Sequence, residues 1–311
     1  MKKRVNVVNA ESKIIKQPRL SINGILLLDK PIGITSNAAL QRVKQLLRAS
    51  KAGHTGSLDP LASGMLPLCF GHATKVSQFL LAADKRYEVT AKLGVKTTTG
   101  DAEGEVIETC SDFSVNREQL QVVLNRFVGL IQQVPSMYSA LKHQGQPLYK
   151  LARQGITIER AARDIHIYEI ELLDLQTDQF TLRVHCSKGT YVRTLIEDIG
   201  EQLDCGGHVT GLRRLSVGVY QPDQMVTFED IDKALIKNDI KPLLLPIESG
   251  LLHLPDVHLS TSSAFYFTRG QGVFLSKINH LGLVRVYDQA QKFLGVGEIS
   301  EEGKVLPKRL M

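Results

Sequence analysis

The 311-residue sequence contains few cysteines and no long apolar segment. Its four cysteines are scattered and form no C-x-x-C pair, a pattern that fits neither a zinc ribbon nor a disulfide-rich secreted scaffold. No apolar run approaches the roughly 18 residues that a bilayer span requires, and polar residues interrupt the basic N-terminus where a signal peptide needs a continuous apolar region. We therefore expect free thiols, no membrane segment and a cytoplasmic location.

Motifs that bind nucleotide cofactors or metals are also missing. The loop of residues 53–64 contains glycines but lacks the Gly-Lys-Ser/Thr ending of a P-loop, and the sequence has no G-x-G-x-x-G fingerprint. No second His or Cys stands at metal-ligand spacing beside His54. We therefore expect neither a cofactor nor a metal.

The charge of the chain is small and uneven. With 38 Lys and Arg against 32 Asp and Glu the net charge is +6, and six basic residues with one acid give residues 1–19 a net charge of +5. Residues 1–21 are expected to form a flexible basic arm. The rest of the chain is nearly neutral, so a site for a polyanion must be a local patch, and the strongest patch is residues 135–163, with five basic residues against Glu159.

The apolar pattern predicts a mixture of strands and helices. Alternation over residues 86–93 places Tyr87 on the same side of a strand as Val89. Residues 97–118, with six acids against Arg117, are expected to form a solvated loop without a chemical role. The other expected elements are strands at 24–28 and 180–186, helices at about 36–47, 73–81, 118–127 and 192–203, and a small β-rich module from about residue 255.

One carboxylate stands out in the loop of residues 53–64. Asp59 is the only acid between Asp29 and Asp84, and Pro60 restricts its backbone to the extended region, so the loop presents its side chain from a stiffened segment. The simpler interpretation is that the Asp-Pro pair only starts a turn.

Arg193 lies where the first turn of a helix is expected, at the positive end of the helix dipole. This position costs a few tenths of a kcal/mol unless an anion compensates, so an acidic group is expected nearby, although a solvated arginine is an alternative. If Asp59 were that partner, a bidentate pair would keep the acid ionised and oriented, which suits a nucleophile.

Four further residues carry less specific signals. His54 could be a surface residue, a general base or a group that packs against a flipped base. Tyr87 could be a core residue or could stack on a base, and Leu212 could be a core leucine whose basic neighbours face phosphates. Lys75 is most simply a solvated lysine.

Several motifs, taken in order, resemble the pseudouridine synthases of the TruB type, bacterial enzymes that isomerise uridine 55 in the T loop of tRNA. The matching segments are GILLLDKP at 24–31, GHTGSLDPLASG at 53–64, KRY at 85–87, PSMYSALK at 135–142 and KGTYVRTLI at 188–196. One departure is Thr98, where the family commonly has aspartate; it lies outside the catalytic set and affects only local loop contacts.

The resemblance assigns roles to single residues. It implies that Asp59 is the catalytic aspartate, that Arg193 is its salt-bridge partner, and that Tyr87 stacks under the target base and is a candidate for moving the C5 proton. The implied substrate-binding residues are His54, which helps displace the nucleotide, Tyr191 and Leu212 in the uracil pocket, and Lys30 and Lys75. The reaction it implies requires no metal and no cofactor.

The resemblance also implies an α/β (α+β) fold, with a mixed, largely antiparallel sheet, flanking helices and a small C-terminal β-barrel. The implied domains are a catalytic domain over 22–248, with a thumb-like RNA-binding insertion at about 135–163, and a PUA-like RNA-binding domain over 249–311. The expected partner is the T arm of tRNA, and the protein is expected to be a monomer without a membrane or protein partner.

Two other functions stay open, and a role in tRNA folding could accompany the isomerase activity. A non-catalytic RNA-binding module would leave Asp59 and Arg193 dispensable. An N-glycosylase or nucleosidase with an aspartate nucleophile would give free uracil or an abasic product.

Overall fold

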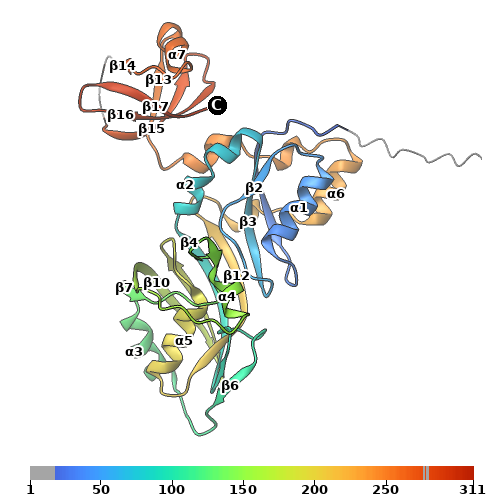
Figure 1. Ribbon diagram of the computed structural model, residues 1–311, viewed down its shortest axis with the longest axis vertical. Coiled ribbons are helices and arrows are strands. Elements are labelled where there is room, and N and C mark those ends of the chain that lie inside the picture. The colour runs from blue at the N-terminus through green and yellow to red at the C-terminus, as the bar shows by residue number, and fades with distance from the viewer. Residues whose placement is uncertain (1–17, 276, 278–279) are drawn as a thin grey trace, which may run out of the picture.

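The computed structural model describes residues 18–311 apart from residues 276, 278 and 279. The predicted basic arm therefore lies outside the described residues up to residue 17. Figure 1 shows a long curved sheet with helices along it and a smaller sheet at the C-terminal end. Within the described part of the chain, no helix has the length and apolar character needed to cross a membrane.

The main sheet has the strand order β1-β3-β12-β4-β11-β10-β7, and β2 pairs with β3 at one end. Only β12 and β3 are parallel among these pairs. The prediction of a mixed, largely antiparallel sheet is confirmed. The strands are β1 (Gly24–Lys30), β2 (Ala52–His54), β3 (Ala62–Phe70), β4 (Lys85–Leu93), β7 (Gly129–Gln133), β10 (Arg163–Leu175), β11 (Gln179–Cys186) and β12 (Gly207–Val217).

Helices pack on the main sheet through apolar faces. Helix α1 (Ser36–Leu46) begins where the Thr35 hydroxyl accepts a hydrogen bond from the amide of Ala38, and it packs on β1 and β3. Helices α3 (Arg117–Arg126) and α5 (Val192–Gln202) cover the half of the sheet formed by β4, β10 and β11. The remaining helices are α2 (Ser77–Ala82), α4 (Leu148–Ala152), α6 (Phe228–Ile236) and α7 (Thr261–Phe267), with 3-10 turns η1 (Gly71–Lys75), η2 (Pro222–Gln224), η3 (Lys241–Leu243) and η4 (Ile247–Leu251).

Two local expectations are wrong. The helix expected over 73–81 is divided, because η1 ends at Lys75 and α2 begins at Ser77. The solvated loop expected over 97–118 contains strand β6 (Val106–Thr109), which pairs with β5 (Val95–Thr97), and it buries the side chains of Thr97 and Asp101. The many acids of this segment therefore did not indicate full exposure.

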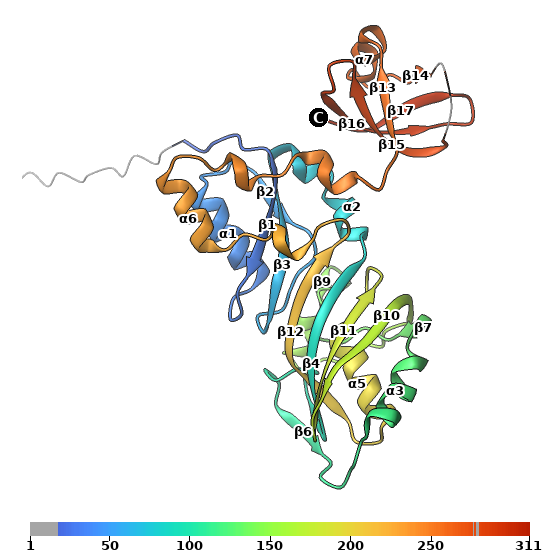
Figure 2. The ribbon, with the colours of Figure 1, turned by 180° about the vertical axis from the view of Figure 1, so that it is seen from behind.

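Alternation along β4 and β11 gives the main sheet two different faces. We call the face that α3 and α5 cover the inner face; it buries Val89, Leu182 and Val184. The opposite, outer face carries Arg86 and Arg183, whose guanidinium groups form ion pairs with carboxylates of β10. Figure 2 shows these strands from behind.

The C-terminal sheet has its own core and the order β13-β15-β16-β17-β14. It contacts the rest of the chain where Val296 of β16 packs with Val76, just before α2, and Leu251 of η4. The small β-rich module expected near the C-terminus is thus present. Its strands are β13 (Asp256–Leu259), β14 (Val273–Phe274), β15 (Gly282–Asp288), β16 (Phe293–Ile299) and β17 (Lys304–Leu310).

Candidate active site

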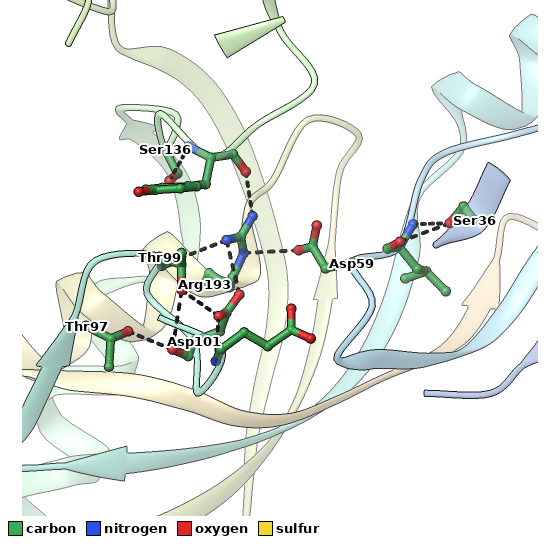
Figure 3. A network of polar contacts seen from close by, with 10 residues as sticks. Ser36, Asp59, Thr97, Thr99, Asp101, Ser136 and Arg193 are labelled. Carbon is green, nitrogen blue, oxygen red and sulfur yellow. Dashed lines mark hydrogen bonds and ion pairs between the residues drawn. The ribbon is translucent and has the colours of Figure 1, made fainter. Parts of the chain in front are cut away.

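The loop that carries Asp59 connects β2 to β3 and is fixed at both sides. The Ser36 hydroxyl donates to the Leu58 carbonyl at 3.0 Å and accepts from the Leu58 amide at 2.7 Å. The Gly33 amide donates to the Pro60 carbonyl at 2.8 Å. The first residue of α1 and the turn before it therefore hold the loop in one conformation on each side of Asp59, as Figure 3 shows for Ser36.

Arg193 lies in the first turn of α5, and its guanidinium contacts Asp59. The distance from Nε to Oδ2 of Asp59 is 3.1 Å, and the side chains are 7% and 42% exposed, respectively. The expectation of an acidic group beside Arg193 is therefore confirmed. The contact uses a single guanidinium nitrogen, whereas a bidentate pair was expected.

The two remaining guanidinium nitrogens have other acceptors, which explains the single contact. Nη1 donates to the Thr99 carbonyl at 2.8 Å and to Oδ2 of Asp101 at 3.2 Å, and Nη2 donates to the Tyr138 carbonyl at 2.7 Å. Figure 3 shows Arg193 between Asp59 and Asp101. One buried cation thus serves two carboxylates and two carbonyl groups.

Asp101 is a component of the site that the sequence analysis missed. Its side chain is 3% exposed, and its Oδ1 accepts from the Thr99 hydroxyl at 2.6 Å and from the Glu103 amide at 3.1 Å. The only signal in the sequence is the threonine two residues before it, since short hydroxyl side chains often bind nearby carboxylates in tight turns. Arg193 is therefore held from behind by a rigid, hydrogen-bonded acid.

The electrostatics of Asp59 differ from the expectation. Burial raises the pKa of Asp59, the Asp101 charge raises this pKa further, and the charges of Arg193 and Lys30 only partly oppose that rise. Arg193 orients the carboxylate, but it does not hold the pKa below its usual range. A poorly solvated carboxylate of this kind is a stronger base and nucleophile than an exposed one.

Lys30 lies behind the loop and not on an open surface. Its side chain is buried, and its ammonium donates to the carbonyls of Pro31 and Ile34, both at 2.8 Å. Burial lowers the pKa of Lys30 to about 8, while the Asp59 charge opposes this shift. The structure therefore places Lys30 as a support for the turn before α1.

Tyr87 and Leu212 lie on neighbouring strands of the inner face. Leu212 pairs with Val89 of β4 and with Ala62 of β3, and Tyr87 pairs with Arg214 of β12. Both side chains are partly buried against the main core, and burial raises the pKa of Tyr87. The structure therefore places these two residues on β12 and β4, the two strands that follow β3 in the sheet, and β3 begins just after the Asp59 loop.

His54 ends β2, close to the start of the loop. Its Nδ1 is buried without a hydrogen-bond partner among the described residues. Burial, and then the charge of Arg214, lower the pKa of His54, so the imidazole is neutral near pH 7.

Tyr191 immediately precedes α5. Its amide donates to Oε1 of Gln133 at 2.8 Å, and its carbonyl accepts from Nε2 of Gln133 at 3.1 Å. Gln133 was not anticipated from the sequence; it fixes the backbone from which α5 and Arg193 start.

Lys75 is not brought to this site by its contacts. It lies in η1, and its ammonium donates to the Leu310 carbonyl in β17 at 2.8 Å. The structure therefore gives Lys75 a role in joining η1 to the C-terminal sheet.

The basic segment of residues 135–163 adjoins the site through Tyr138, whose carbonyl accepts from Arg193. Four of its five basic side chains are exposed: Lys142, Lys150, Arg153 and Arg163. A cavity of about 450 Å³ lies between this segment and α5 and is lined by Tyr138, Arg160 and Glu197, among others. Exposed positive charge therefore lies beside the half-buried Asp59 and the buried Arg193.

Three family models match consecutive parts of the chain. The model described as TruB family pseudouridylate synthase (N terminal domain) matches residues 44–192. The tRNA pseudouridylate synthase B C-terminal domain matches residues 193–252, and pseudouridine synthase II TruB, C-terminal, matches residues 255–311. The first match contains Asp59 and Tyr87, and the second begins at Arg193.

Relatives that span nearly the whole chain have the name tRNA pseudouridine synthase B. One from Stutzerimonas stutzeri (strain A1501) is 54% identical over 300 residues, covering 96% of this chain and 98% of the relative. One from Coxiella burnetii (strain RSA 331 / Henzerling II) is 51% identical over 302 residues, covering 96% and 97%.

Two solved structures share the fold along most of the chain. A chain in a Cbf5-Nop10-Gar1 complex is 28% identical with a TM-score of 0.71, and the match covers 93% of this chain and 84% of that chain. A chain in an H/ACA RNP bound to a substrate RNA containing 2′-deoxyuridine is 26% identical with the same TM-score, and the match covers 92% and 84%.

Proposed function

This chain belongs to the TruB family of pseudouridine synthases, and from that premise we propose that it converts uridine 55 in the T loop of tRNA to pseudouridine, with Asp59 as the covalent catalyst. The observation that carries the assignment of Asp59 is its contact with Arg193. The guanidinium is almost fully buried, whereas the carboxylate is two-fifths exposed. The acid can therefore meet a substrate while its partner stays behind it.

The chemistry of the reaction fits this arrangement. The N1–C1′ bond of uridine breaks, the uracil turns within the site, and a C5–C1′ bond forms, without a net redox change or hydrolysis. Arg193 contacts only Oδ2 of Asp59, which leaves Oδ1 free for the substrate. Oδ1 can attack C1′ or C6, or it can take a proton from the sugar. Each of these steps needs an ionised carboxylate that the substrate can reach.

The target base must leave its stack before it can reach Asp59, which costs a few kcal/mol. In our proposal, stacking on Tyr87, contacts with Leu212 and Tyr191, and the displacing group His54 offset this cost. The exposed basic side chains of residues 135–163 hold the phosphates of the T arm.

The proposal also covers the domains, the oligomeric state and the location of the protein. We propose residues 22–248 as the catalytic domain and residues 249–311 as an RNA-binding domain of the PUA type. We further propose that the protein acts as a monomer in the cytoplasm, and a role in tRNA folding remains an additional prediction.

The test is an assay on a T-arm transcript with wild-type protein and the Asp59→Asn variant. We expect the wild type to produce a carbodiimide-reactive uridine isomer of unchanged mass at position 55, and the variant to lose this activity while its tRNA affinity stays within a few-fold. Full activity of the variant would contradict the assignment of Asp59. Release of free uracil by the wild type would identify an N-glycosylase instead.

A further inference from the structure

Two adjacent arginines of β12 lie on opposite faces of the main sheet and have different partners. Arg213 forms a bidentate pair with Asp29, with distances of 2.9 Å from Nη1 to Oδ1 and 2.8 Å from Nη2 to Oδ2. Arg214 is 1% exposed and forms no ion pair with any Asp or Glu in the described part of the chain. Its acceptors are the carbonyls of Met65, at 2.7 Å from Nε, and Gly56, at 3.0 Å from Nη2. A buried guanidinium without a carboxylate is costly, so its charge requires an explanation.

Arg214 lies on β12, between β3 and β4, close to the candidate active site. It pairs with Gly64 of β3 on one side and with Tyr87 of β4 on the other. Gly64 has φ +96°, and a Cβ there would lie 2.2 Å from the Arg214 carbonyl oxygen, so only glycine allows this approach of the two strands. Through Gly56, the guanidinium also contacts the loop that presents Asp59.

Of the titratable groups near Arg214, Tyr87 is the one whose ionised form the Arg214 charge stabilises. The Arg214 charge lowers the pKa of Lys30, His54 and Lys85, which are cationic or neutral groups that gain nothing from a nearby cation. Tyr87 is the neighbour of Arg214 across the pair of strands β12 and β4, and the Arg214 charge opposes the rise that burial causes in the pKa of Tyr87. Among the described groups whose pKa the Arg214 charge shifts, Tyr87 is therefore the one that becomes an anion on losing its proton, and Arg214 is placed to stabilise that phenolate across the strand pair.

We propose that Arg214 is a positioning residue that acts on Tyr87 across the strand pair and stabilises the Tyr87 phenolate, which then takes the C5 proton of the rotated uracil. This inference rests on the proposed function. After the C5–C1′ bond has formed, the C5–H bond breaks and its proton moves to the phenolate oxygen. The C–H electron pair forms the C5=C6 bond, the former N1=C6 pair becomes a lone pair on N1, and N1 takes a proton from water. The phenol then returns its proton to water.

The experiment compares Arg214→Met and Arg214→Lys with the wild type, on T-arm transcripts that carry hydrogen or deuterium at C5 of the target uridine. In Arg214→Met we expect product formation to fall about 100-fold, tRNA affinity to stay within about threefold, and the C5 isotope effect to rise from near 1 to above 2 because proton removal becomes rate-limiting. The midpoint of the pH–rate profile should also move to higher pH, by about one pH unit, because the phenolate of Tyr87 has lost a stabilising charge. Arg214→Lys should form product at least tenfold faster than Arg214→Met.

Arg213→Met is the matched control, because it removes the neighbouring arginine from the outer face. Its isotope effect and pH profile should equal those of the wild type. If Arg214→Met does not fold, the variants Arg214→Lys, Tyr87→Phe and their combination decide, since a shared step predicts that their effects on the rate are not additive.

The proposal is overturned if an active, folded Arg214 variant shows an unchanged isotope effect and pH profile. It is also overturned if the variant mainly loses tRNA affinity and its salt dependence, which would make Arg214 a phosphate ligand. A wild type that forms no pseudouridine would instead contradict the proposed function itself, so the two failures are distinguishable.

Discussion

The two faces of the main sheet use charge in different ways. On the outer face, Arg86 pairs with Glu169 and Arg183 pairs with Glu171, each with one partner and each with side chains at least two-fifths exposed. On the inner side, Arg193 of α5 is shared by two carboxylates, and Arg214 of β12 has no carboxylate partner in the described part of the chain. Alternation along the strands separates the two faces, and the helices that cover the inner face bury the charges there.

The difference indicates which charges serve the chemistry. Exposed one-to-one ion pairs contribute about 0–1 kcal/mol each, so they can be lost at little cost. Buried charges without matched partners are costly to maintain, and a substrate or a reacting group can complete them. Substitutions on the inner face should therefore change the rate, whereas substitutions on the outer face should change little.

The largest effect is expected for Arg193→Ala. The substitution leaves Asp59 and Asp101 without their shared cation, so Asp59 loses its orientation and its pKa rises further. We expect the single-turnover rate to fall about 1,000-fold while tRNA affinity changes only a few-fold. Arg183→Ala on the outer face is the control and should keep the wild-type rate. Equal losses of rate in the two variants would contradict the idea that only the inner side of the sheet serves the chemistry.

A smaller effect is expected for Asp101→Asn, which keeps the size of the side chain and removes one of the two negative charges beside Arg193. We expect a rate loss of about 10- to 100-fold from weaker positioning of the guanidinium. Because the Asp101 charge raises the pKa of Asp59, its removal should move the acid limb of the pH–rate profile to lower pH. A limb that moves to higher pH would contradict this coupling.

The next effect concerns binding through the exposed basic segment of residues 135–163. Replacing Lys142 and Arg153 with glutamine should reduce the slope of log affinity against log salt concentration by about 1.5, because each exposed cation that contacts a phosphate releases roughly one counterion. Filter binding at several salt concentrations measures this slope. Lys233→Gln on α6, which removes an exposed lysine paired with Glu229, should leave the slope unchanged.

The smallest effect is expected in stability, at Glu197 on α5. Burial raises the pKa of Glu197 to about 7, so the folded chain keeps a proton that the unfolded chain has already lost above about pH 4.5. The free energy of unfolding therefore falls as the pH rises from about 4.5 to 7 and stays reduced above this range. We expect Glu197→Gln to raise the Tm by a few degrees at pH 8 and to leave it unchanged at pH 4; equal shifts at both values would contradict this origin.

The parts of the site that could be predicted depend on local physics or on the resemblance. The helix dipole at Arg193 predicted an acidic partner without knowledge of the fold, and alternation on β4 placed Tyr87 on the inner face. The resemblance supplied the class of the main sheet and the pairing of Asp59 with Arg193.

The parts that could not be predicted depend on contacts between distant segments. Asp101 reaches Arg193 only because its acidic loop folds back against α5, and Gln133 holds Tyr191 across the gap between β7 and that helix. Lys75 was expected to bind the substrate, but its ammonium contacts Leu310, which lies far along the chain in β17 of the C-terminal sheet. No local pattern of charge or hydropathy encodes such pairings.

The convergence of segments on Arg193 has a consequence for how activity is acquired as the chain folds. The acceptors of its guanidinium come from the Asp59 loop, the Thr99–Asp101 turn and Tyr138, and α5 supplies the arginine itself. None of these segments is adjacent to another in the sequence. A refolding chain can thus regain its helical circular dichroism before this crossing point is assembled, and catalytic competence should be the last property to return.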